Sequence, residues 1–265
     1  MKIDNCAALI TGASAGIGRE FAGQLAFRAR SLILVARREQ RLSELRDELT
    51  KKHPSLSVHI HKTDLADLSK IDELVAWLQR ERLDVDLLIN NAGLGDAGSF
   101  ANSDPRRIDE MMLVNIVALT RLTRALLPQM IQRKRGAILN VGSSAGFLPI
   151  PEFNVYAATK AYVNNFSEAL RAELRGTGVT VTALCPGPVH TEFQEVAKRL
   201  RGKPEYGPEF VHVPVERVVG DALRAVEADR PLVIPGLIMK LGMFLVRITP
   251  MPILRLAWRF GAKSG

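Results

Sequence analysis

The chain has few residues that could bind a metal ion or form cross-links. Its 265 residues include two cysteines, Cys6 and Cys185, and five histidines. The cysteines lie in separate apolar stretches and the histidines are scattered, so neither residue type shows a motif spacing. We therefore expect two buried thiols in a reducing compartment rather than a disulfide, and no metal site. A chain of this length can bury a sizeable core without a disulfide or a structural metal ion.

The sequence also leaves no room for a secretory leader. Its first apolar run, residues 7–10, leads directly into a glycine-rich turn, and we therefore expect a cytoplasmic protein. No internal repeat and no segment rich in proline, glycine or serine divides the chain. This organisation predicts one domain over residues 1–235, with a proline-rich substrate loop at 186–214 that holds a short helix near 191–201, followed by an extension at 236–265.

Acidic residues are absent from residue 236 to the end, where five basic residues occur: Lys240, Arg247, Arg255, Arg259 and Lys263. The formal net charge of +8 therefore resides largely in this extension, and the remainder of the chain is nearly balanced. Because no basic–aromatic stripe or DNA-reading motif accompanies the charge, we do not expect a nucleic-acid partner.

The extension is also strongly apolar. Residues 236–248 are apolar nearly all the way round a helix, and a second short apolar helix is predicted at 253–260 after two prolines. Neither segment reaches the roughly 20 apolar residues that span a bilayer. Three interpretations stay open: packing over the substrate cleft or another subunit, peripheral contact of 236–260 with an anionic membrane surface, and the wall of a hydrophobic substrate tunnel.

Short apolar runs alternate with helical patterns through most of the chain. The predicted strands are 7–11, 31–36, 57–62, 86–90, 136–142, 179–184 and 232–234, and the predicted helices are 17–29, 38–51, 68–82, 104–134, 155–176 and 215–228. Strands that are apolar throughout are typical of a parallel sheet covered on both faces. We therefore predict an α/β fold with a Rossmann-like, doubly wound seven-stranded parallel sheet of order 3-2-1-4-5-6-7, with helices on both faces.

A glycine-rich turn follows the first predicted strand and precedes a helix. Such glycines let the backbone approach a pyrophosphate, and the helix amides then provide an anion site. An ordinary tight turn uses the same residues, but the strand–turn–helix context favours a dinucleotide site. The candidate cofactor residues in this turn are Gly12, Ser14, Ala15, Gly16, Ile17 and Gly18.

The end of the second predicted strand indicates which dinucleotide is bound. Ala36 stands where NAD-binding sheets carry an acid for the ribose hydroxyls, and Arg37 and Arg38 follow it. Guanidinium groups bind a 2′-phosphate through paired, charge-assisted hydrogen bonds, so NADP(H) is favoured over NAD(H). Either arginine could instead open a solvated helix. After the third strand, Asp64, followed by Leu65, could accept a hydrogen bond from the adenine or cap a helix.

Tyr156 and Lys160 are four residues apart in a predicted helix and therefore share one of its faces. A nearby cation lowers the pKa of a tyrosine, which is about 10 in the free side chain, and makes it useful for proton exchange. Ser143, with Ser144 beside it, ends the fifth strand, where open α/β sheets bind ligands. Asn115 lies inside the long predicted helix, where it could keep a backbone site open for water.

With these residues assembled, the sequence resembles the short-chain dehydrogenase/reductase family from about residue 5 to 235. Each motif is modest alone, but together and in this order they are specific. The motifs are TGASAGIG at 11–18, NNAG at 90–93, Ser143, YAATK at 156–160 and PGPVHT at 186–191.

The resemblance implies roles for these residues. Ser143 would polarise the substrate oxygen, Tyr156 would be the general acid or base, and Lys160 would bind the nicotinamide ribose and lower the tyrosine pKa. Asn115 would position a relay water through its backbone. The family pattern further implies a nicotinamide clamp formed by Pro186, Gly187, Val189 and Thr191, and an adenosine-ribose lining formed by Asn90, Asn91, Ala92 and Gly93.

The resemblance implies an NADP(H)-dependent oxidoreductase that transfers a hydride to or from a small carbonyl/alcohol substrate, and the apolar extension favours an apolar ketone or a 3-oxoacyl compound. A non-catalytic NADP(H) sensor or scaffold is the alternative, but such a protein has no need of the proton-transfer residues. The family pattern also implies a homodimer or homotetramer that pairs through the long helices at 104–134 and 155–176.

Overall fold

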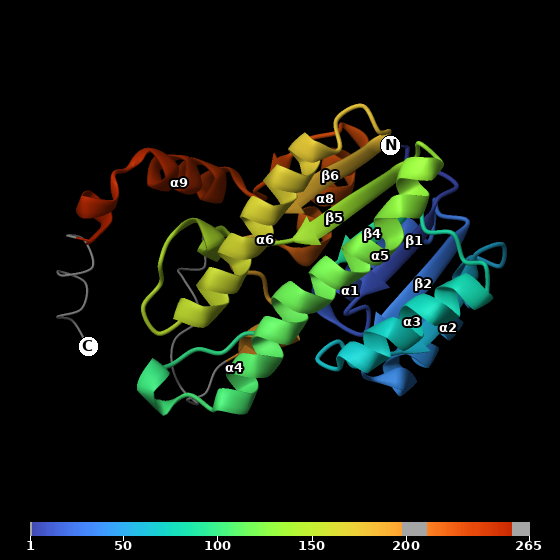
Figure 1. Cartoon of the computed structure of the whole chain (residues 1–265), viewed down its shortest axis with the longest axis horizontal. Helices are drawn as coiled ribbons and strands as arrows, with labels where there is room; N and C mark the ends of the chain where they lie inside the picture. Colours follow the sequence, from blue (N-terminus) through green and yellow to red (C-terminus); the bar gives the residue numbers. More distant parts are fainter. Residues whose placement is uncertain (1, 198–210, 256–265) are drawn as a thin grey trace.

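The computed structural model describes residues 2–197 and 211–255 (Figure 1). Seven parallel strands form one sheet in the order β3-β2-β1-β4-β5-β6-β7, which confirms the predicted class and strand order. The strands are β1 (Ala7–Thr11), β2 (Ser31–Ala36), β3 (Ser57–Lys62), β4 (Leu87–Asn90), β5 (Gly136–Val141), β6 (Val179–Leu184) and β7 (Leu232–Val233).

Helices cover both faces of the sheet. One face carries α1 (Gly16–Leu25), α2 (Glu39–Lys52) and α8 (Val215–Glu227), whose apolar side chains share one core cluster with the strands. The other face carries α3 (Leu68–Arg80), α5 (Leu119–Gln132) and α6 (Asn154–Glu173) in a second cluster. Because every residue of the central strands β1, β4 and β5 is buried, these strands are apolar on both sides.

The long helix predicted at 104–134 is present over Pro105–Gln132, but its winding changes along its length. It consists of α4 (Pro105–Met112), a π-helical turn η2 (Leu113–Ala118) and α5. Pro105 opens α4 behind Asp104, whose carboxylate accepts a hydrogen bond from the Arg106 amide at 3.0 Å. The predicted helix is therefore confirmed over Pro105–Gln132, with a wider π-helical turn at its centre.

The loop after β6 contains α7 (Glu192–Ala197), which accounts for the first part of the short helix predicted at 191–201. The rest of that prediction lies outside the described residues. Two short 3₁₀ turns lie within residues 2–197, η1 (Phe100–Asn102) and η3 (Ser144–Phe147). After β7 the chain enters α9 (Leu237–Ile248), which extends to one side of the sheet at the red end of the chain (Figure 1).

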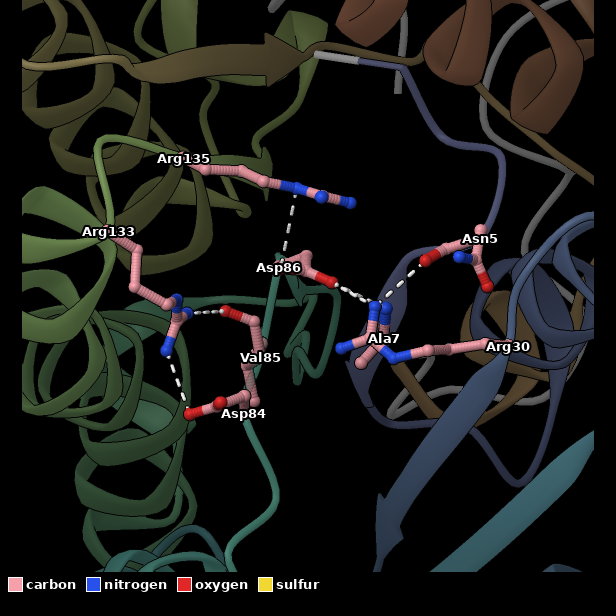
Figure 2. Close-up of polar contacts among 8 residues, drawn as sticks. All are labelled: Asn5, Ala7, Arg30, Asp84, Val85, Asp86, Arg133 and Arg135. Atoms are coloured by element: carbon pink, nitrogen blue, oxygen red, sulfur yellow. Dashed lines mark hydrogen bonds and ion pairs between the residues drawn. The ribbon is translucent and has the colours of Figure 1, made fainter.

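A buried carboxylate fastens the amino ends of the central strands (Figure 2). Asp86, immediately before β4, accepts hydrogen bonds from the Ala7 backbone amide at 3.0 Å and from Arg30 at 2.7 Å. Arg135, before β5, lies 3.7 Å from the same carboxylate, and Arg30 also donates to the Asn5 carbonyl at 2.8 Å. One acid therefore joins the starts of four neighbouring strands at the edge of the sheet opposite its carboxyl ends.

A third arginine holds the turn between α5 and β5 to the same edge (Figure 2). Arg133 donates to the Asp84 carboxylate at 2.9 Å and to the Val85 carbonyl at 2.7 Å. Asp84 is mostly exposed, whereas Asp86 is only 5% exposed. The two acids thus have similar partners in different environments, which makes them a matched pair for mutation.

The segment Pro105–Gln132 is long and apolar enough to cross a membrane by length and composition alone, with a mean hydropathy of 1.3 over its best window. Its buried residues, including Val114, Leu122 and Met130, belong to the core cluster on one face of the sheet. Core helices pass the same test, and 44% of that window is buried inside the protein.

Candidate active site

A cleft of about 830 Å³ lies at the carboxyl ends of the strands, where open α/β sheets bind their ligands. Every candidate residue from the sequence analysis lines it except Gly18, Asn90 and Asn115. The candidates that line it are Gly12, Ser14, Ala15, Gly16, Ile17, Arg37, Arg38, Asp64, Leu65, Asn91, Ala92, Gly93, Ser143, Ser144, Tyr156, Lys160, Pro186, Gly187, Val189 and Thr191.

The glycine-rich turn brings the backbone close to the neighbouring strand. Gly12 has a φ of +68°, and a side chain there would place its Cβ 2.9 Å from the Ala92 Cα. A Cβ at Gly18 would lie 2.3 Å from the Gly12 carbonyl oxygen. Gly18 therefore permits close packing of α1 against the turn and does not face the cleft. The N-terminus of α1, at Gly16, lies at the cleft and presents free backbone amides there.

Two asparagines at the end of β4 have different positions. Asn91 lines the cleft, and its side chain donates to the Thr11 carbonyl at 2.9 Å. Asn90 is buried and donates to Asn140 at 2.8 Å and to Thr123 at 3.0 Å. The prediction that Asn90 lines the cofactor ribose was therefore wrong, because the alternation of a β-strand turns its side chain into the core.

Arg38 joins three elements at the rim of the cleft. Its guanidinium donates to the Ser14 hydroxyl at 3.1 and 3.2 Å and to the Glu192 carboxylate at 2.9 Å. Glu192, the first residue of α7, also accepts a hydrogen bond from Arg41 at 2.6 Å. These hydrogen bonds, first from Arg38 and then from Arg41, hold the pKa of Glu192 below its usual value. Sequence reasoning missed Glu192, although it directly follows the PGPVHT motif.

Asp64 also lines the cleft, and its carboxylate accepts a hydrogen bond from the Ala66 amide at 3.0 Å. It therefore stabilises the turn after β3, whereas the N-cap of α3 is Asp67, which accepts from the Ser69 amide at 2.8 Å. The capping role considered for Asp64 belongs to Asp67. Arg37 is exposed beside this turn and lines the same part of the cleft.

The inner part of the cleft holds Tyr156 and Lys160, which both point from α6. The Lys160 ammonium nitrogen lies 5.7 Å from the centre of the Tyr156 ring and donates to the Val141 carbonyl at 2.8 Å. Lys160 is only 4% exposed, and this burial lowers the pKa of its ammonium to about 8. The two side chains are thus close neighbours in a site that excludes most water.

Ser143 lies two residues after the end of β5, and its hydroxyl accepts a hydrogen bond from the Ala145 amide at 3.1 Å. Ser144 lines the cleft as well and is equally buried. The backbone at Ser143 is held from behind, because Asn164 donates to its carbonyl at 3.1 Å and in turn accepts from the Cys185 thiol at 3.1 Å. The contacts of α6 therefore position the loop that carries both serines.

Asn115 lies in the π-helical turn and is 1% exposed. Its amide oxygen accepts from the Leu94 amide at 2.8 Å, and its amide nitrogen donates to the Leu94 carbonyl at 2.9 Å and to Thr159 at 3.0 Å. A Cβ at Gly93 would lie 3.3 Å from the Lys160 ammonium and 3.5 Å from the Asn115 amide oxygen. Asn115 therefore stands behind the cleft and joins its floor to the helix that carries Lys160.

Apolar side chains surround the Tyr156 phenol. The Phe153 ring stacks on Tyr156 with ring centres 4.2 Å apart, and the Phe193 ring lies 5.5 Å away. Other apolar residues that line this end of the cleft are Leu94, Ala97, Leu148, Ile150 and Met243. Sequence reasoning did not single out these residues, because apolar residues in loops carry no motif. Among the described residues that line the cleft, the cations are Arg37, Arg38 and Lys160.

Both cysteines are free and buried, as predicted. Burial raises the pKa of the Cys6 thiol to about 11 and that of the Cys185 thiol to about 12, so both are protonated at neutral pH. Within residues 2–197 and 211–255, no group of three or more His, Cys, Asp and Glu side chains is placed to hold a metal ion.

The sheet order and the glycine-rich turn at the first crossover define a Rossmann-like nucleotide-binding protein. The sequence profile of the short chain dehydrogenase family matches residues 6–201. The chain therefore belongs to that family, and the resemblance inferred from its motifs is confirmed.

Known relatives agree with this assignment. The chain is 44% identical to a sulfoacetaldehyde reductase of Chromohalobacter salexigens, over 69% of this chain and 72% of that protein. It is 40% identical to the NADP-dependent 3-hydroxy acid dehydrogenase YdfG of Escherichia coli, over 73% of this chain and 76% of that protein.

Solved structures resemble the whole fold. A short-chain dehydrogenase from Sphingobium yanoikuyae in complex with NADPH superposes with a TM-score of 0.79 at 34% identity, over 88% of each chain. A bulky-bulky ketone specific alcohol dehydrogenase from Comamonas testosteroni superposes with a TM-score of 0.75 at 30% identity, over 93% of this chain and 95% of that one. By their names, these relatives are reductases and dehydrogenases that differ in substrate.

Proposed function

We propose that this protein is an NADP(H)-dependent oxidoreductase that transfers a hydride between the nicotinamide and an apolar carbonyl/alcohol pair. The observation that carries the proposal is the pairing, in one cleft, of a phosphate-binding rim with a buried Tyr156–Lys160 pair. The family supports the reaction class, since its members here are oxidoreductases.

The residues at the rim fit NADP(H). Gly12 and Gly16 have positive φ angles and no side chain beside the N-terminus of α1. A pyrophosphate can therefore approach the backbone amides there closely. Ala36 offers no acid to repel a 2′-phosphate, and Arg37 and Arg38 line the same part of the cleft. Two relatives support this cofactor prediction: the NADP-dependent 3-hydroxy acid dehydrogenase of Escherichia coli, and the Sphingobium yanoikuyae dehydrogenase whose structure contains NADPH.

The proposed chemistry assigns one task to each polar residue of the inner cleft. When bound, the cofactor supplies or accepts the hydride. Ser143 donates a hydrogen bond to the substrate oxygen, and Tyr156 donates the proton to that oxygen as negative charge develops on it. Lys160 holds a positive charge beside the phenol and favours its anionic form, while Asn115 keeps the floor below Lys160 in place.

The lining of the cleft favours an apolar ketone as the substrate. Phe153, Phe193, Leu94 and Ile150 border the phenol, and Lys160 is the cation among the described residues that line that end. A sulfonate or carboxylate substrate would require a cationic partner there, because a charge without one is costly to bury. The relative specific for bulky ketones supports the same substrate class.

The experiment measures NADPH and NADH oxidation by the purified protein with aldehydes, bulky apolar ketones, 3-oxoacyl thioesters and sulfoacetaldehyde. We expect turnover with NADPH and an apolar ketone, and a loss of about 100-fold or more in Tyr156→Phe with NADPH binding retained. Tyr162→Phe, on the exposed side of the same helix, is the matched control and retains activity. Full activity in Tyr156→Phe would refute the mechanism, and tight NADPH binding without turnover would favour a sensor.

We further propose a homodimer or homotetramer that pairs through α4, α5 and α6. This proposal rests on the family pattern. Large apolar side chains on these helices are exposed in the single chain, among them Met112, Ile131 and Tyr162.

The prediction of a cytoplasmic protein stays a prediction.

A further inference from the structure

The helix α9 presents an apolar surface to solvent. Six of its large apolar residues are exposed, and they recur at the spacing that places them on one side of a helix. These residues, here called the outer face, are Leu237 (68% exposed), Ile238 (52%), Leu241 (56%), Phe244 (60%), Leu245 (59%) and Ile248 (60%). A contiguous exposed surface of this kind marks an interaction site rather than an ordinary helix surface.

The opposite side of α9 rests on the protein. A Cβ at Gly187 would lie 2.9 Å from the Met239 side chain, and Met243 lines the cleft. The guanidinium of Arg247 lies 5.6 Å from the centre of the Phe147 ring, in η3. These contacts fix the rotation of the helix about its axis, so the outer face points away from the body and lies beside the apolar end of the cleft.

Positive charge borders the outer face. Lys240 and Arg247 are seven residues apart, on the same flank of α9, and both are exposed. Arg255 follows in the next helical turn and is also exposed. No acidic residue follows Asp229 in the sequence, so nothing within this segment neutralises the cations. An apolar arc edged with cations is typical of helices that lie in the surface of an anionic membrane.

We propose that α9 binds an anionic lipid surface, with its outer face among the acyl chains and Lys240 and Arg247 beside lipid phosphates. With 12 residues, α9 is about 18 Å long and cannot span a bilayer. If the outer faces of two copies packed together about a two-fold axis, the cations of both copies would lie close to one another. Neither segment has an acid to neutralise them, so this contact would be opposed by repulsion. Lipid headgroups supply the missing negative charge.

This surface places the apolar end of the cleft next to lipid, because Met243 and the outer face belong to the same helix. If the proposed function also holds, apolar ketones dissolved in the membrane reach the cleft without crossing water. Membrane binding itself does not depend on the reaction, so the two proposals are tested by separate measurements.

The test is flotation of the purified full-length chain with phosphatidylcholine vesicles that either contain or lack phosphatidylglycerol. We expect binding to the anionic vesicles, weakened by salt, and roughly tenfold or greater loss in the double variant Leu241→Glu/Phe244→Glu. A second double variant, Lys240→Gln/Arg247→Gln, loses about tenfold on anionic vesicles only. Phe27→Glu is the matched control, because Phe27 is 77% exposed and lies outside α9, and we expect it to bind as the unmodified chain does.

Two results would overturn the proposal. One is an unmodified chain that does not float with anionic vesicles, and the other is a Leu241→Glu/Phe244→Glu variant that floats as well as the unmodified chain. If the unmodified chain does not float and the mass of the variant in solution, measured by light scattering, is lower than that of the unmodified chain, a second copy covers the outer face instead. Thermal unfolding of each variant separates these results from misfolding.

Discussion

The carboxylate of Glu192 and the guanidinium of Arg38 form an ion pair of 2.9 Å at the rim of the cleft. The pair joins the start of α7 to the start of α2, and Arg41 reinforces it from the α2 side. Because Arg38 is also a proposed ligand of the cofactor 2′-phosphate, the carboxylate and the phosphate compete for the same guanidinium.

Glu192→Gln therefore strengthens NADPH binding and leaves NADH binding nearly unchanged. The pair is about half exposed, so its screened contribution is at most about 1 kcal/mol, which corresponds to about fivefold in the NADPH dissociation constant. Fluorescence titration with both cofactors measures the effect. Glu73→Gln, which removes an exposed acid of α3, is the control. Weaker NADPH binding in Glu192→Gln would show that the acid holds the loop closed over the cofactor instead.

Arg38→Ala lowers the affinity for NADPH but not that for NADH. A charge-assisted hydrogen bond contributes about 1.5–3 kcal/mol, so we expect the preference for NADPH to fall about 10- to 100-fold. The ratio of kcat/KM with the two cofactors measures the preference. Arg41→Ala is the matched control, because Arg41 contacts Glu192 but does not line the cleft. An unchanged ratio in Arg38→Ala would leave Arg37 as the phosphate ligand.

Lys160 makes the stability of the cofactor-free chain depend on pH. Burial lowers the pKa of its ammonium from 10.5 to about 8, so between these values the unfolded chain binds more protons at this side chain than the folded chain does. The free energy of unfolding therefore rises with pH across this window, by up to about 1.4 kcal/mol per pH unit. Below the window the ammonium is charged in both states, and its burial lowers the free energy of unfolding by the full amount of about 3 kcal/mol.

Lys160→Met removes this dependence. The free energy of unfolding of the unmodified chain, measured by urea denaturation relative to that of Lys160→Met, should rise by about 3 kcal/mol from pH 7.5 to 10.5. Lys51→Met, at an exposed position of α2, gives a nearly constant difference over the same range. A constant difference for Lys160→Met would mean that the ammonium is stabilised within the folded protein by contacts that offset its burial.

The fold and the residues of the cleft were largely predictable, because both follow from local sequence. Uniformly apolar runs such as Leu32–Val35 identify buried parallel strands, and the chemistry depends on residues at fixed spacings, such as Tyr156 and Lys160. The alternation of strands and helices then implies right-handed crossovers and a doubly wound sheet.

What could not be predicted depends on contacts between distant segments. The π-helical turn coincides with the hydrogen bonds of Asn115 to Leu94 and Thr159, which no helical periodicity reveals. Glu192 became a cleft residue only because α7 lies beside Arg38. The outer face of α9 is likewise set by which side of an apolar helix meets the body, and its sequence is apolar on nearly every side.

Asp86 gives the last prediction, because it is a buried acid far from the cleft. Asp86→Ala leaves the buried Ala7 amide without its acceptor and removes the partner of Arg30. An unsatisfied buried donor costs about 1–3 kcal/mol, and the loss of the ion pair adds to this, so we expect the free energy of unfolding to fall by about 2–4 kcal/mol. Urea denaturation measures the change, and NADPH binding by the folded variant should be retained.

Asp84→Ala is the matched control, since Asp84 lies two residues away and pairs with Arg133 at the surface. An exposed ion pair contributes about 1 kcal/mol at most, because water and salt screen it and its partners stay solvated when it is lost. If both variants lose the same stability, burial of Asp86 contributes nothing. If Asp86→Ala alone is destabilised, the difference comes from the buried contacts of Asp86, with the β1 amide and its arginine partners, rather than from ion pairing at the surface.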